Sequence, residues 1–226
     1  MPTPFKNRIT AGRALAMELA EYTSHPDLLV LGLPRGGVPV ADQVARALHA
    51  ELDVIVVRKI GAPGHPELAL GAVASGGLFV SNAEFADVIG DSAAIRKITD
   101  RERRTVTERE RLYRCGRPAA RIKDREVILV DDGAATGASM LVAIRALRKL
   151  GASRIVVALP VASQSALRKL VPEADAVVCA SAPPAFQAVG DWYQDFSATS
   201  DSEVCELLKT DSSPGITRSG AAPSDR

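Results

Sequence analysis

The chain has 226 residues, of which 46% are hydrophobic and 4% aromatic, and this size and composition suit one domain with a single sizeable core. Its formal net charge of +1 excludes a global field that would select nucleic acid or an anionic membrane. The opening residues, MPTPFKNR, lack the apolar stretch of a secretion signal, and no apolar run is long enough to span a bilayer. Three scattered cysteines, Cys115, Cys179 and Cys205, show no metal-binding spacing and indicate reduced thiols. We therefore expect a soluble cytoplasmic protein.

The first part of the sequence predicts a helix followed by two strands with a helix between them. Apolar residues at helical spacing indicate a helix over 11–22. A short apolar strand then ends at Leu33, and a Gly/Pro-rich turn leads into a helix from about Val38. A second strand is expected over Asp53–Val57, which leaves an Arg-Lys pair at its end.

A loop and a charged helix are expected next. Residues 61–77 are rich in chain breakers and small residues, so we expect a flexible loop with one short strand near 70–74. The segment from Asp91 to about Arg114 predicts a long charged helix, with Ser92 as a candidate cap. Its many opposite charges at four-residue spacing are typical of a solvated helical arm, over about 91–115.

The second half of the sequence alternates strands and helices. A buried strand over Glu126–Val130 is followed by a turn of small residues and a helix over Ser139–Leu150. Two further strands, SRIVVALPVAS and ADAVVCASAPP, enclose a helix over Gln164–Leu170. An irregular aromatic segment then leads to a short helix capped near Ser200 or Ser202. This alternation predicts a doubly wound, mainly parallel α/β sheet, whose ligands bind beyond the carboxyl ends of the strands.

Three distinctive turns fall at that edge of the sheet: PRGG, VRKIG and VDDGAATGAS. In the last of them the small residues let the backbone approach a ligand closely. Successive N–H groups and the start of the next helix then form an anion site suited to a phosphate, to which Thr136 and Ser139 can add hydroxyl donors. Asp131 and Asp132 would repel a phosphate, so we expect them to face vicinal ribose hydroxyls or a hydrated Mg²⁺. A sugar phosphate satisfies both halves of this turn.

Simple packing, nucleotide-binding loops of other folds and receiver domains each account for less of this turn. Tight packing between strand and helix would not require two adjacent aspartates. The sequence contains no GxxxxGK[ST] and no GxGxxG, which argues against a P-loop and against a dinucleotide site. An acidic pair after a strand also occurs in phosphate-accepting receiver domains, but the further aspartate and lysine that those domains carry on later strands are missing.

The stretch VILVDDGAATGAS resembles the 5-phosphoribosyl-1-pyrophosphate (PRPP) signature of type I phosphoribosyltransferases, and LGLPRGGVPVA resembles the pyrophosphate loop of that family. The resemblance extends from roughly Asn7 to Leu208. Within it, RKIGAPGHPELALGAV and AVGDWYQDF resemble an uncharacterised branch of the family. The resemblance implies a type I phosphoribosyltransferase-like domain over 1–209, and we expect a disordered Ser/Pro/Gly-rich tail over 210–226.

Carried over by position, the resemblance assigns a role to each turn. Asp131 and Asp132 would bind the ribose hydroxyls and contact Mg²⁺ mostly through the ligand or water. The 5-phosphate would lie on Gly133, Ala134, Ala135, Thr136, Gly137, Ala138 and Ser139. The pyrophosphate would lie on Pro34, Arg35, Gly36 and Gly37, with a cis peptide bond expected between Pro34 and Arg35.

Arg58 and Lys59, expected at the next strand end, are placed for the charge of the pyrophosphate, although such a pair is also compatible with a solvated surface. The segment 61–77 matches the family's flexible catalytic loop, whose closure would exclude water. Glu67 and His65 in this loop are candidates for a catalytic or contact role, although an exposed loop carboxylate is more often simply solvated.

The reaction that the resemblance implies belongs to nucleotide metabolism. A nitrogen nucleophile, usually of a nucleobase, would displace pyrophosphate from C1 of PRPP through an oxocarbenium-like transition state, with Mg²⁺ neutralising the leaving group. Ala135 departs from the pattern of some purine-using relatives, which carry an aspartate there to handle the proton of the base. The departure removes one obvious general base without excluding catalysis.

In this family the acceptor is selected by a hood built from both ends of the domain, here about 1–10 and 183–209. The candidate segments are Phe5 to Arg8 and Phe186 to Phe196. The second segment concentrates the aromatic side chains of a chain otherwise poor in them, namely Trp192, Tyr193 and Phe196. These rings would either stack on a planar base or close a small hood core.

The charged helix carries six arginines that we interpret mainly as a solvated face: Arg101, Arg103, Arg104, Arg109, Arg111 and Arg114. Some of them are alternatively in reach of a bound polyphosphate or of a neighbouring subunit. Tyr113, Arg114 and Arg117 lie just before the signature strand and are the best placed to approach the site.

Two functions therefore remain open from the sequence. The first is a transferase that acts on PRPP and a small nitrogenous acceptor, with no nucleic acid or membrane partner and with a homodimer as an open possibility. The alternative is a non-catalytic regulatory protein that binds PRPP or a nucleotide, although the sequence lacks the DNA-binding domain or basic surface that regulators usually add. A hydrolase would need a water-activating residue that the sequence does not identify.

Overall fold

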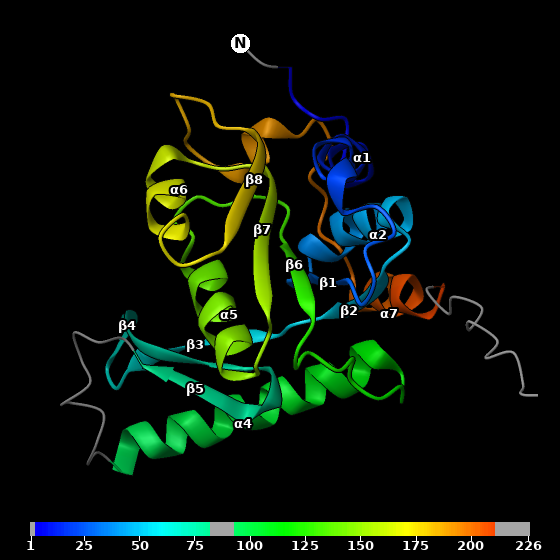
Figure 1. The fold of residues 1–226 in the computed structure, drawn as a ribbon. Coiled ribbons are helices and arrows are strands. Elements are labelled where there is room, and N and C mark those ends of the chain that lie inside the picture. The colour runs from blue at the N-terminus through cyan, green and yellow to red at the C-terminus, as the bar shows by residue number, and fades with distance from the viewer. Residues whose placement is uncertain (1–2, 82–92, 211–226) are drawn as a thin grey trace, which may run out of the picture.

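The computed structural model describes residues 3–81 and 93–210. At its centre lies a five-stranded, fully parallel sheet with the strand order β2-β1-β6-β7-β8 (Figure 1). Its strands are β1 (Leu29–Gly32), β2 (Glu51–Val54), β6 (Glu126–Val130), β7 (Arg154–Val161) and β8 (Ala176–Ser181). The prediction of a doubly wound parallel sheet is confirmed.

Helices cover both faces of this sheet, and the strand sequences show why. Alternate residues of each inner strand enter opposite cores: Val127 and Leu129 of β6 pack on the α5 side, whereas Ile128 and Val130 pack on the α2 side. Strands buried on both faces are continuously apolar, as β6 and β7 are. Helices α1 and α2 lie on one face and α5 and α6 on the other (Figure 1). The helices are α1 (Arg8–Glu18), α2 (Gly37–Leu48), α4 (Ala93–Arg114), α5 (Ala138–Lys149), α6 (Gln164–Leu170) and α7 (Asp201–Thr210).

The topological switch point of the sheet, where the order in which the chain adds strands reverses, lies between β1 and β6. The chain moves from β1 outward to β2 on one side, and from β6 outward to β7 and β8 on the other. The register pairs Gly32 with Val130, so both strands end at the same level. Ligands of open α/β sheets bind at such a point, beyond the carboxyl ends of the strands.

A second, antiparallel sheet occupies the segment that the sequence predicts as a loop over 61–77. It has the order β3-β4-β5, with β3 (Val57–Ala62), β4 (His65–Ala74) and β5 (Leu78–Ser81). Apolar residues such as Ile60 and Val73 are buried in the core and hold this hairpin despite its glycines and prolines. The expectation of a loop with one short strand is thus wrong in secondary structure, although the flexibility of the segment stays a prediction.

The strand predicted over Asp53–Val57 is also divided differently. The parallel strand β2 ends at Val54, one further hydrogen bond joins the N–H of Ile55 to the carbonyl of Gly32 at 3.2 Å, and Val57 already opens the antiparallel β3. Because β1 turns away at Gly32 into the PRGG loop, the chain loses its pairing partner there. From Val57 onward it pairs with β4 instead, and just before β3 the carbonyl of Val56 accepts the N–H of Ser75, the residue after β4, at 2.9 Å.

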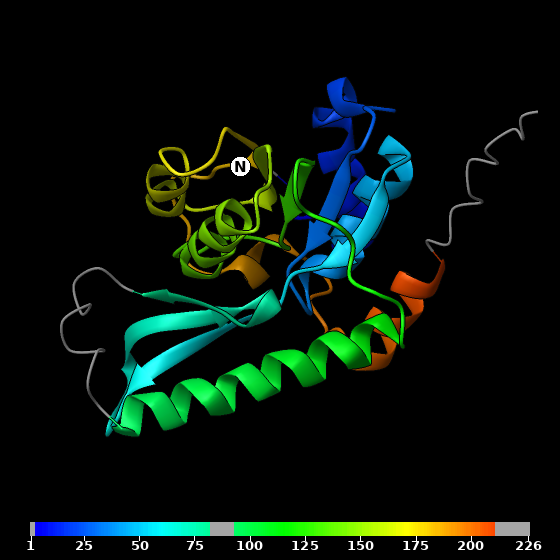
Figure 2. The same ribbon diagram turned by 60° about the horizontal axis from the view of Figure 1, so that its bottom comes forward.

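Helix α4 runs along the antiparallel sheet and reaches α7 with its C-terminal end (Figure 2). It begins at Ala93, and the predicted start at Asp91 with the Ser92 cap lies outside the described residues. The predicted tail beyond 210 also lies outside them. Within 3–81 and 93–210, no helix is both long enough and apolar enough to cross a bilayer.

A buried ion pair fastens the end of α4 to the parallel sheet. The guanidinium Nε of Arg114 lies 2.9 and 3.0 Å from the two carboxylate oxygens of Asp53 on β2, and its Nη2 donates to the carbonyl of Val54 at 3.0 Å. The side chains are 9% and 3% exposed. Asp53 also accepts the backbone N–H of Ala120 at 2.9 Å, so each charge is well satisfied.

We expect Arg114→Met to lower the free energy of unfolding by about 3–5 kcal/mol, because removing one partner leaves the other charge buried and unpaired. The control is Arg145→Met, which breaks the more exposed pair with Glu173 and should cost no more than about 1 kcal/mol. Urea denaturation of both variants measures the difference. Equal losses in the two variants would contradict the structural role of the Arg114 pair.

Candidate functional site

The loops that follow β1 and β6 meet at the topological switch point of the sheet. Leu33 follows β1 and donates its backbone N–H to the carbonyl of Val130 at the end of β6, at 2.9 Å. The peptide bond between Pro34 and Arg35 is cis, which confirms that prediction. A Cβ placed on Gly36 would lie 2.0 Å from Oδ2 of Asp132. A side chain at position 36 would therefore displace the Asp132 carboxylate, whereas a Cβ on Gly37 would lie 2.8 Å from the backbone of Asp131 and of Val130, so only glycine fits at position 37.

The loop of small residues after the acidic pair is held open by its neighbours. The carbonyl of Ala134 accepts the backbone N–H of Ser163 at 2.9 Å, and the Ser163 hydroxyl donates to the carbonyl of Ala135 at 2.6 Å. Gly137, at the start of α5, has a left-handed backbone (φ 73°) that favours glycine. Residues 131 and 133–140 line a cavity of about 130 Å³.

The N–H groups around this cavity suit an anion. In the part of the chain that the structure describes, the backbone N–H groups of Ala135, Thr136 and Gly137 have no hydrogen-bond acceptor. The first turn of α5 begins at Ala138, whose N–H lies 3.4 Å from the hydroxyl of Thr136, and it adds the positive end of the helix dipole. Backbone donors at a helix N-terminus form a phosphate site without any charged side chain.

The two carboxylates are unequal in their surroundings. Oδ1 of Asp131 accepts the backbone N–H of Asp132 at 2.9 Å. Burial, and after it the charge of Asp132, raise the pKa of Asp131 well above its ordinary value. Burial also raises the pKa of Asp132, but the nearby charge and hydrogen bonds of Arg8 oppose that shift. Asp131 is therefore the carboxylate with the greater need for hydrogen-bond donors.

Arg8 joins the N-terminal segment to the acidic pair. Its Nε and Nη2 both lie 2.8 Å from Oδ2 of Asp132, and its Nη1 donates to the carbonyl of Ser197 at 2.7 Å. The guanidinium stacks over the ring of Phe196, 4.0 Å from its centroid. The sequence placed Arg8 in a hood segment, but no sequence signal paired it with Asp132.

The N- and C-terminal segments do form one small unit above the strand ends. Phe5 and Tyr193 form a short parallel bridge, supported by hydrogen bonds of 2.8 Å from Phe5 N–H to the carbonyl of Trp192 and from Gln194 N–H to the carbonyl of Phe5. Tyr193 is buried, and its hydroxyl donates to the carbonyl of Asp132 at 2.5 Å. Burial, and after it the charge of Asp132, raise the pKa of Tyr193, which keeps this donor protonated.

The three hood aromatics consequently differ in what they can contact. Tyr193 belongs to the hood core, together with Ala11 and Val161. Trp192 packs against that core, and among the described residues its indole N–H is buried without an acceptor. Phe196 is 38% exposed and carries Arg8 on its ring. Of the three, Phe196 has the most accessible ring.

Arg58 and Lys59 lie on β3 of the antiparallel sheet and not at the end of a parallel strand, which corrects the expected placement. The Nε of Arg58 pairs with Oε2 of Glu102 on α4 at 3.0 Å, so this arginine helps to join α4 to β3. His65 is exposed at the start of β4. The side chain of Glu67 lies outside the described part of the structure. The catalytic roles of Arg58, Lys59 and Glu67 stay predictions.

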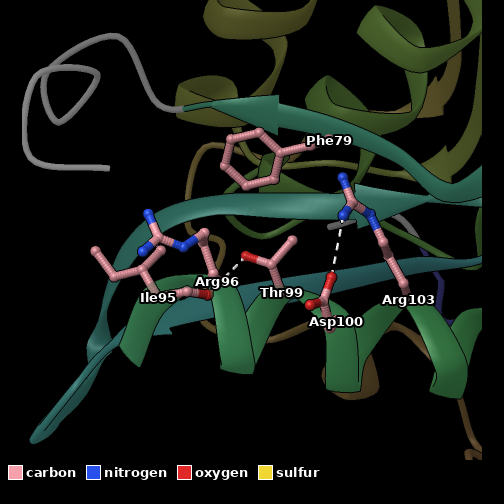
Figure 3. A pocket seen from close by; sticks show the side chains of 6 residues that line it. All are labelled: Phe79, Ile95, Arg96, Thr99, Asp100 and Arg103. Carbon is pink, nitrogen blue, oxygen red and sulfur yellow. Dashed lines mark hydrogen bonds and ion pairs between the residues drawn. The ribbon is translucent and has the colours of Figure 1, made fainter. Parts of the chain in front are cut away.

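The arginines of α4 mostly form an exposed face, as expected for Arg101, Arg103, Arg104 and Arg111, whereas Arg109 is half-buried and Arg114 is buried. A cavity of about 220 Å³ lies between this helix and β5, with Phe79 facing Ile95 and Thr99 across it (Figure 3). At its rim, Arg103 pairs with Asp100 at 3.2 Å. The pocket contains none of the strand-end residues and lies outside the candidate site.

Of the three residues expected to approach the site from the end of α4, only Tyr113 is linked to it. Its hydroxyl donates to Oδ1 of Asp201 at 3.0 Å, and the same oxygen lies 3.7 Å from Nη1 of Arg35 in the PRGG loop. Arg114 is held by Asp53, and Arg117 donates to the carbonyl of Leu208 at 2.5 Å. Asp201 was missed because nothing in its local sequence indicates a contact with the PRGG loop.

The carboxylate oxygens available at this site fit an Mg²⁺ ion that is held mainly by a substrate. Within the described ranges, no three His, Cys, Asp or Glu side chains gather to form a metal cage. Asp131 and Asp132 offer two carboxylates, and one oxygen of Asp132 is already taken by Arg8. Mg²⁺ is commonly bound by one or two carboxylates together with waters and substrate phosphates, which matches these two side chains.

Comparison with known proteins links this geometry to one family. The profile of the phosphoribosyl transferase domain matches residues 5–194. A Mycobacterium tuberculosis protein named "Putative phosphoribosyl transferase", found in strains H37Rv and CDC 1551, is 41% identical over 208 residues. The match covers 90% of this chain but 46% of the mycobacterial protein, so the chain spans about half the length of that relative.

A solved structure resembles the whole fold. The crystal structure of the protein TT1426 from Thermus thermophilus is 47% identical in sequence, with a TM-score of 0.81. The match covers 91% of this chain and 98% of the Thermus chain. The overall arrangement of the chain is thus shared with a second protein.

We expect Asp131→Asn to stabilise the protein at neutral and alkaline pH. Because the pKa of Asp131 is raised in the folded state, ionisation of this carboxyl costs stability as the pH rises through that pKa. The amide removes the cost, so the melting temperature should rise by at least about 2–4 °C at pH 8, which corresponds to about 1 kcal/mol for a domain of this size. Below the ordinary pKa of an aspartate the gain should vanish.

The control is Asp175→Asn, because Arg148 and the backbone N–H of Ile155 lower the pKa of Asp175. Here ionisation has the opposite effect on stability. The Asp175 carboxylate stabilises the fold at neutral pH, and this contribution is lost as the pH falls through the lowered pKa. Melting curves between pH 3 and 8 compare the two variants. A lower melting temperature for Asp131→Asn at pH 8 would show that ionised Asp131 is stabilised and not strained.

Proposed function

The chain belongs to the phosphoribosyltransferase family, and from this premise we propose that it transfers the ribose 5-phosphate group of PRPP to a nitrogenous acceptor. In the proposed reaction Mg²⁺ is required, pyrophosphate is released, and the acceptor is of the nucleobase class. The observation that carries the proposal is the meeting of two loops at the ends of the adjacent strands β1 and β6. One loop offers free backbone donors, and the other crosses a pair of carboxylates.

The 5-phosphate is assigned to the small-residue loop over 133–139 and the start of α5. Apart from Asp131 and Met140, this cavity is lined only by glycine, alanine, serine and threonine residues, so a phosphate can approach the N–H groups closely. The helix dipole and these donors act together on an anion. Ser163 binds the carbonyls of Ala134 and Ala135, which fixes the backbone of this loop.

The ribose is assigned to the acidic pair. A carboxylate whose pKa is raised by burial gains most from hydrogen-bond donors, because donors favour its charged form. Vicinal ribose hydroxyls supply two such donors, and Asp131 accepts only one backbone N–H among the described residues. Arg8 orients Asp132 from the opposite side. Substrate binding should therefore relieve the cost of holding Asp131 ionised.

The pyrophosphate is assigned to the PRGG loop, where the backbone of Gly36 and Gly37 lies against the acidic pair. The side chain of Arg35 is half-exposed and weakly paired with Asp201, so it is free to exchange that partner for a phosphate oxygen. Mg²⁺, when bound with the substrate beside Asp131 and Asp132, neutralises charge on the pyrophosphate. The protein then mainly orients the acceptor nitrogen toward C1 and stabilises the departing charge.

The acceptor is assigned to the hood over 186–196 and the facing residues 5–8. Phe196 presents the most accessible ring of the hood aromatics, and Trp192 carries a buried N–H without an acceptor among the described residues. Ala135 provides no carboxylate for the proton of a base. We therefore assign the proton of the reacting nitrogen to solvent, which favours acceptors that enter the site with this nitrogen already deprotonated.

The first experiment is calorimetric titration of PRPP with Mg²⁺ into the wild type and into Asp131→Asn/Asp132→Asn. We expect binding by the wild type and at least a tenfold loss in the double variant, because both carboxylate partners of the ribose are replaced by amides. A screen of nucleobases for pyrophosphate release then identifies the acceptor.

The matched control is Glu173→Gln/Asp175→Asn, which removes the same charge near the amino end of β8, where these side chains pair with Arg145 and Arg148. It should bind PRPP like the wild type. Absence of PRPP binding by the wild type would overturn the proposal. Binding without pyrophosphate release for any base would instead support a non-catalytic PRPP-binding protein.

A further inference from the structure

Two thiols lie together where the end of α4 meets α7. The Sγ atoms of Cys115 and Cys205 lie 3.4 and 3.1 Å from one acceptor, the carbonyl oxygen of Leu112. Cys115 follows the last turn of α4, and Cys205 lies in the middle of α7. Sharing one carbonyl brings the two sulfur atoms close, although the residues are far apart in the sequence.

The nearness of the two thiols also affects the ionisation of Cys205. Burial raises the pKa of Cys205, and the neighbouring Cys115 thiol raises it further. Cys115 is exposed, whereas Cys205 is buried. An exposed thiol beside a buried one is the arrangement in which the first can be oxidised from solvent and the second can capture the product.

We propose that Cys115 and Cys205 form an intramolecular disulfide in response to peroxide. Cys115, as its thiolate, attacks one oxygen of hydrogen peroxide, which breaks the O–O bond, gives a sulfenic acid and releases hydroxide that is protonated to water. The sulfur of Cys205 then attacks the sulfur of Cys115, and a second water leaves. In total, two S–H bonds are replaced by one S–S bond while the peroxide is reduced to two waters.

The cross-link would fasten α7 to the end of α4. Asp201 lies one turn before Cys205 and therefore on the same face of α7. This aspartate accepts the hydroxyl of Tyr113 on α4 and faces Arg35 of the PRGG loop. The disulfide thus adds a covalent bond to a junction that already holds the Tyr113–Asp201 hydrogen bond and the contact of the Cys205 thiol with the carbonyl of Leu112. This inference is independent of the proposed transferase reaction.

The test is treatment of the full chain with hydrogen peroxide, followed by alkylation of free thiols and mass spectrometry of proteolytic peptides. We expect the wild type to lose two of its three thiols and to yield a cross-linked pair containing Cys115 and Cys205, two hydrogens lighter than the separate peptides. A reductant should restore both thiols. Closing such a long loop restricts the unfolded chain, so the oxidised protein should melt at a higher temperature than the reduced one.

Variants separate the outcomes. Cys179→Ser removes the cysteine on β8, whose Sγ contacts the carbonyl of Ser181, and should keep the cross-link. Cys115→Ser, at an exposed position, should abolish both the cross-link and the gain in melting temperature. Cys205→Ala should leave Cys115 to proceed to sulfinic acid. Sulfinic acid at Cys115 in the wild type, or a disulfide between two chains through Cys115, would overturn the proposal.

Discussion

The parallel pairing of β1 with β6 is the contact on which the candidate site depends. Its register sets Gly32 beside Val130, so both strands release their chains at one level and in one direction. The PRGG loop then has to cross the acidic pair within van der Waals reach, which leaves no room for a side chain at Gly37. A shift of one residue in this register would separate the two loops and turn each alternate side chain into the wrong core.

The site is built at the expense of stability. Asp131 and Asp132 are adjacent carboxylates in an enclosed position, and both have raised pKa values. Arg8 compensates one of them, whereas a ligand has to compensate the other. Such a local loss of stability is expected at a binding site, where the hydrogen-bond donors of a ligand offset it. By contrast, the buried pair of Arg114 and Asp53 is fully satisfied within the protein, as suits a structural joint.

Helix α7 connects parts of the molecule that are distant in the sequence. Through Asp201 it faces both the PRGG loop and Tyr113 of α4, and through Cys205 it donates to the carbonyl of Leu112, which also accepts the thiol of Cys115. The hood also depends on chain ends, because Phe5 and Tyr193 pair directly above the acidic pair. The two ends of the domain thus close the site that the middle of the chain provides.

The sequence by itself determined the doubly wound sheet, the positions of α2, α5 and α6, the acidic pair with its small-residue turn, and the cis bond before Arg35. These features follow from local periodicity, from turn chemistry and from the resemblance to one family. Each of these signals is carried by short continuous stretches of the sequence. Only the tertiary structure decided that residues 57–81 form an antiparallel sheet, that Arg58 pairs with Glu102, and that Arg8 binds Asp132. These contacts join residues far apart in the chain, and their stability comes from burial and charge pairing, which no local pattern encodes.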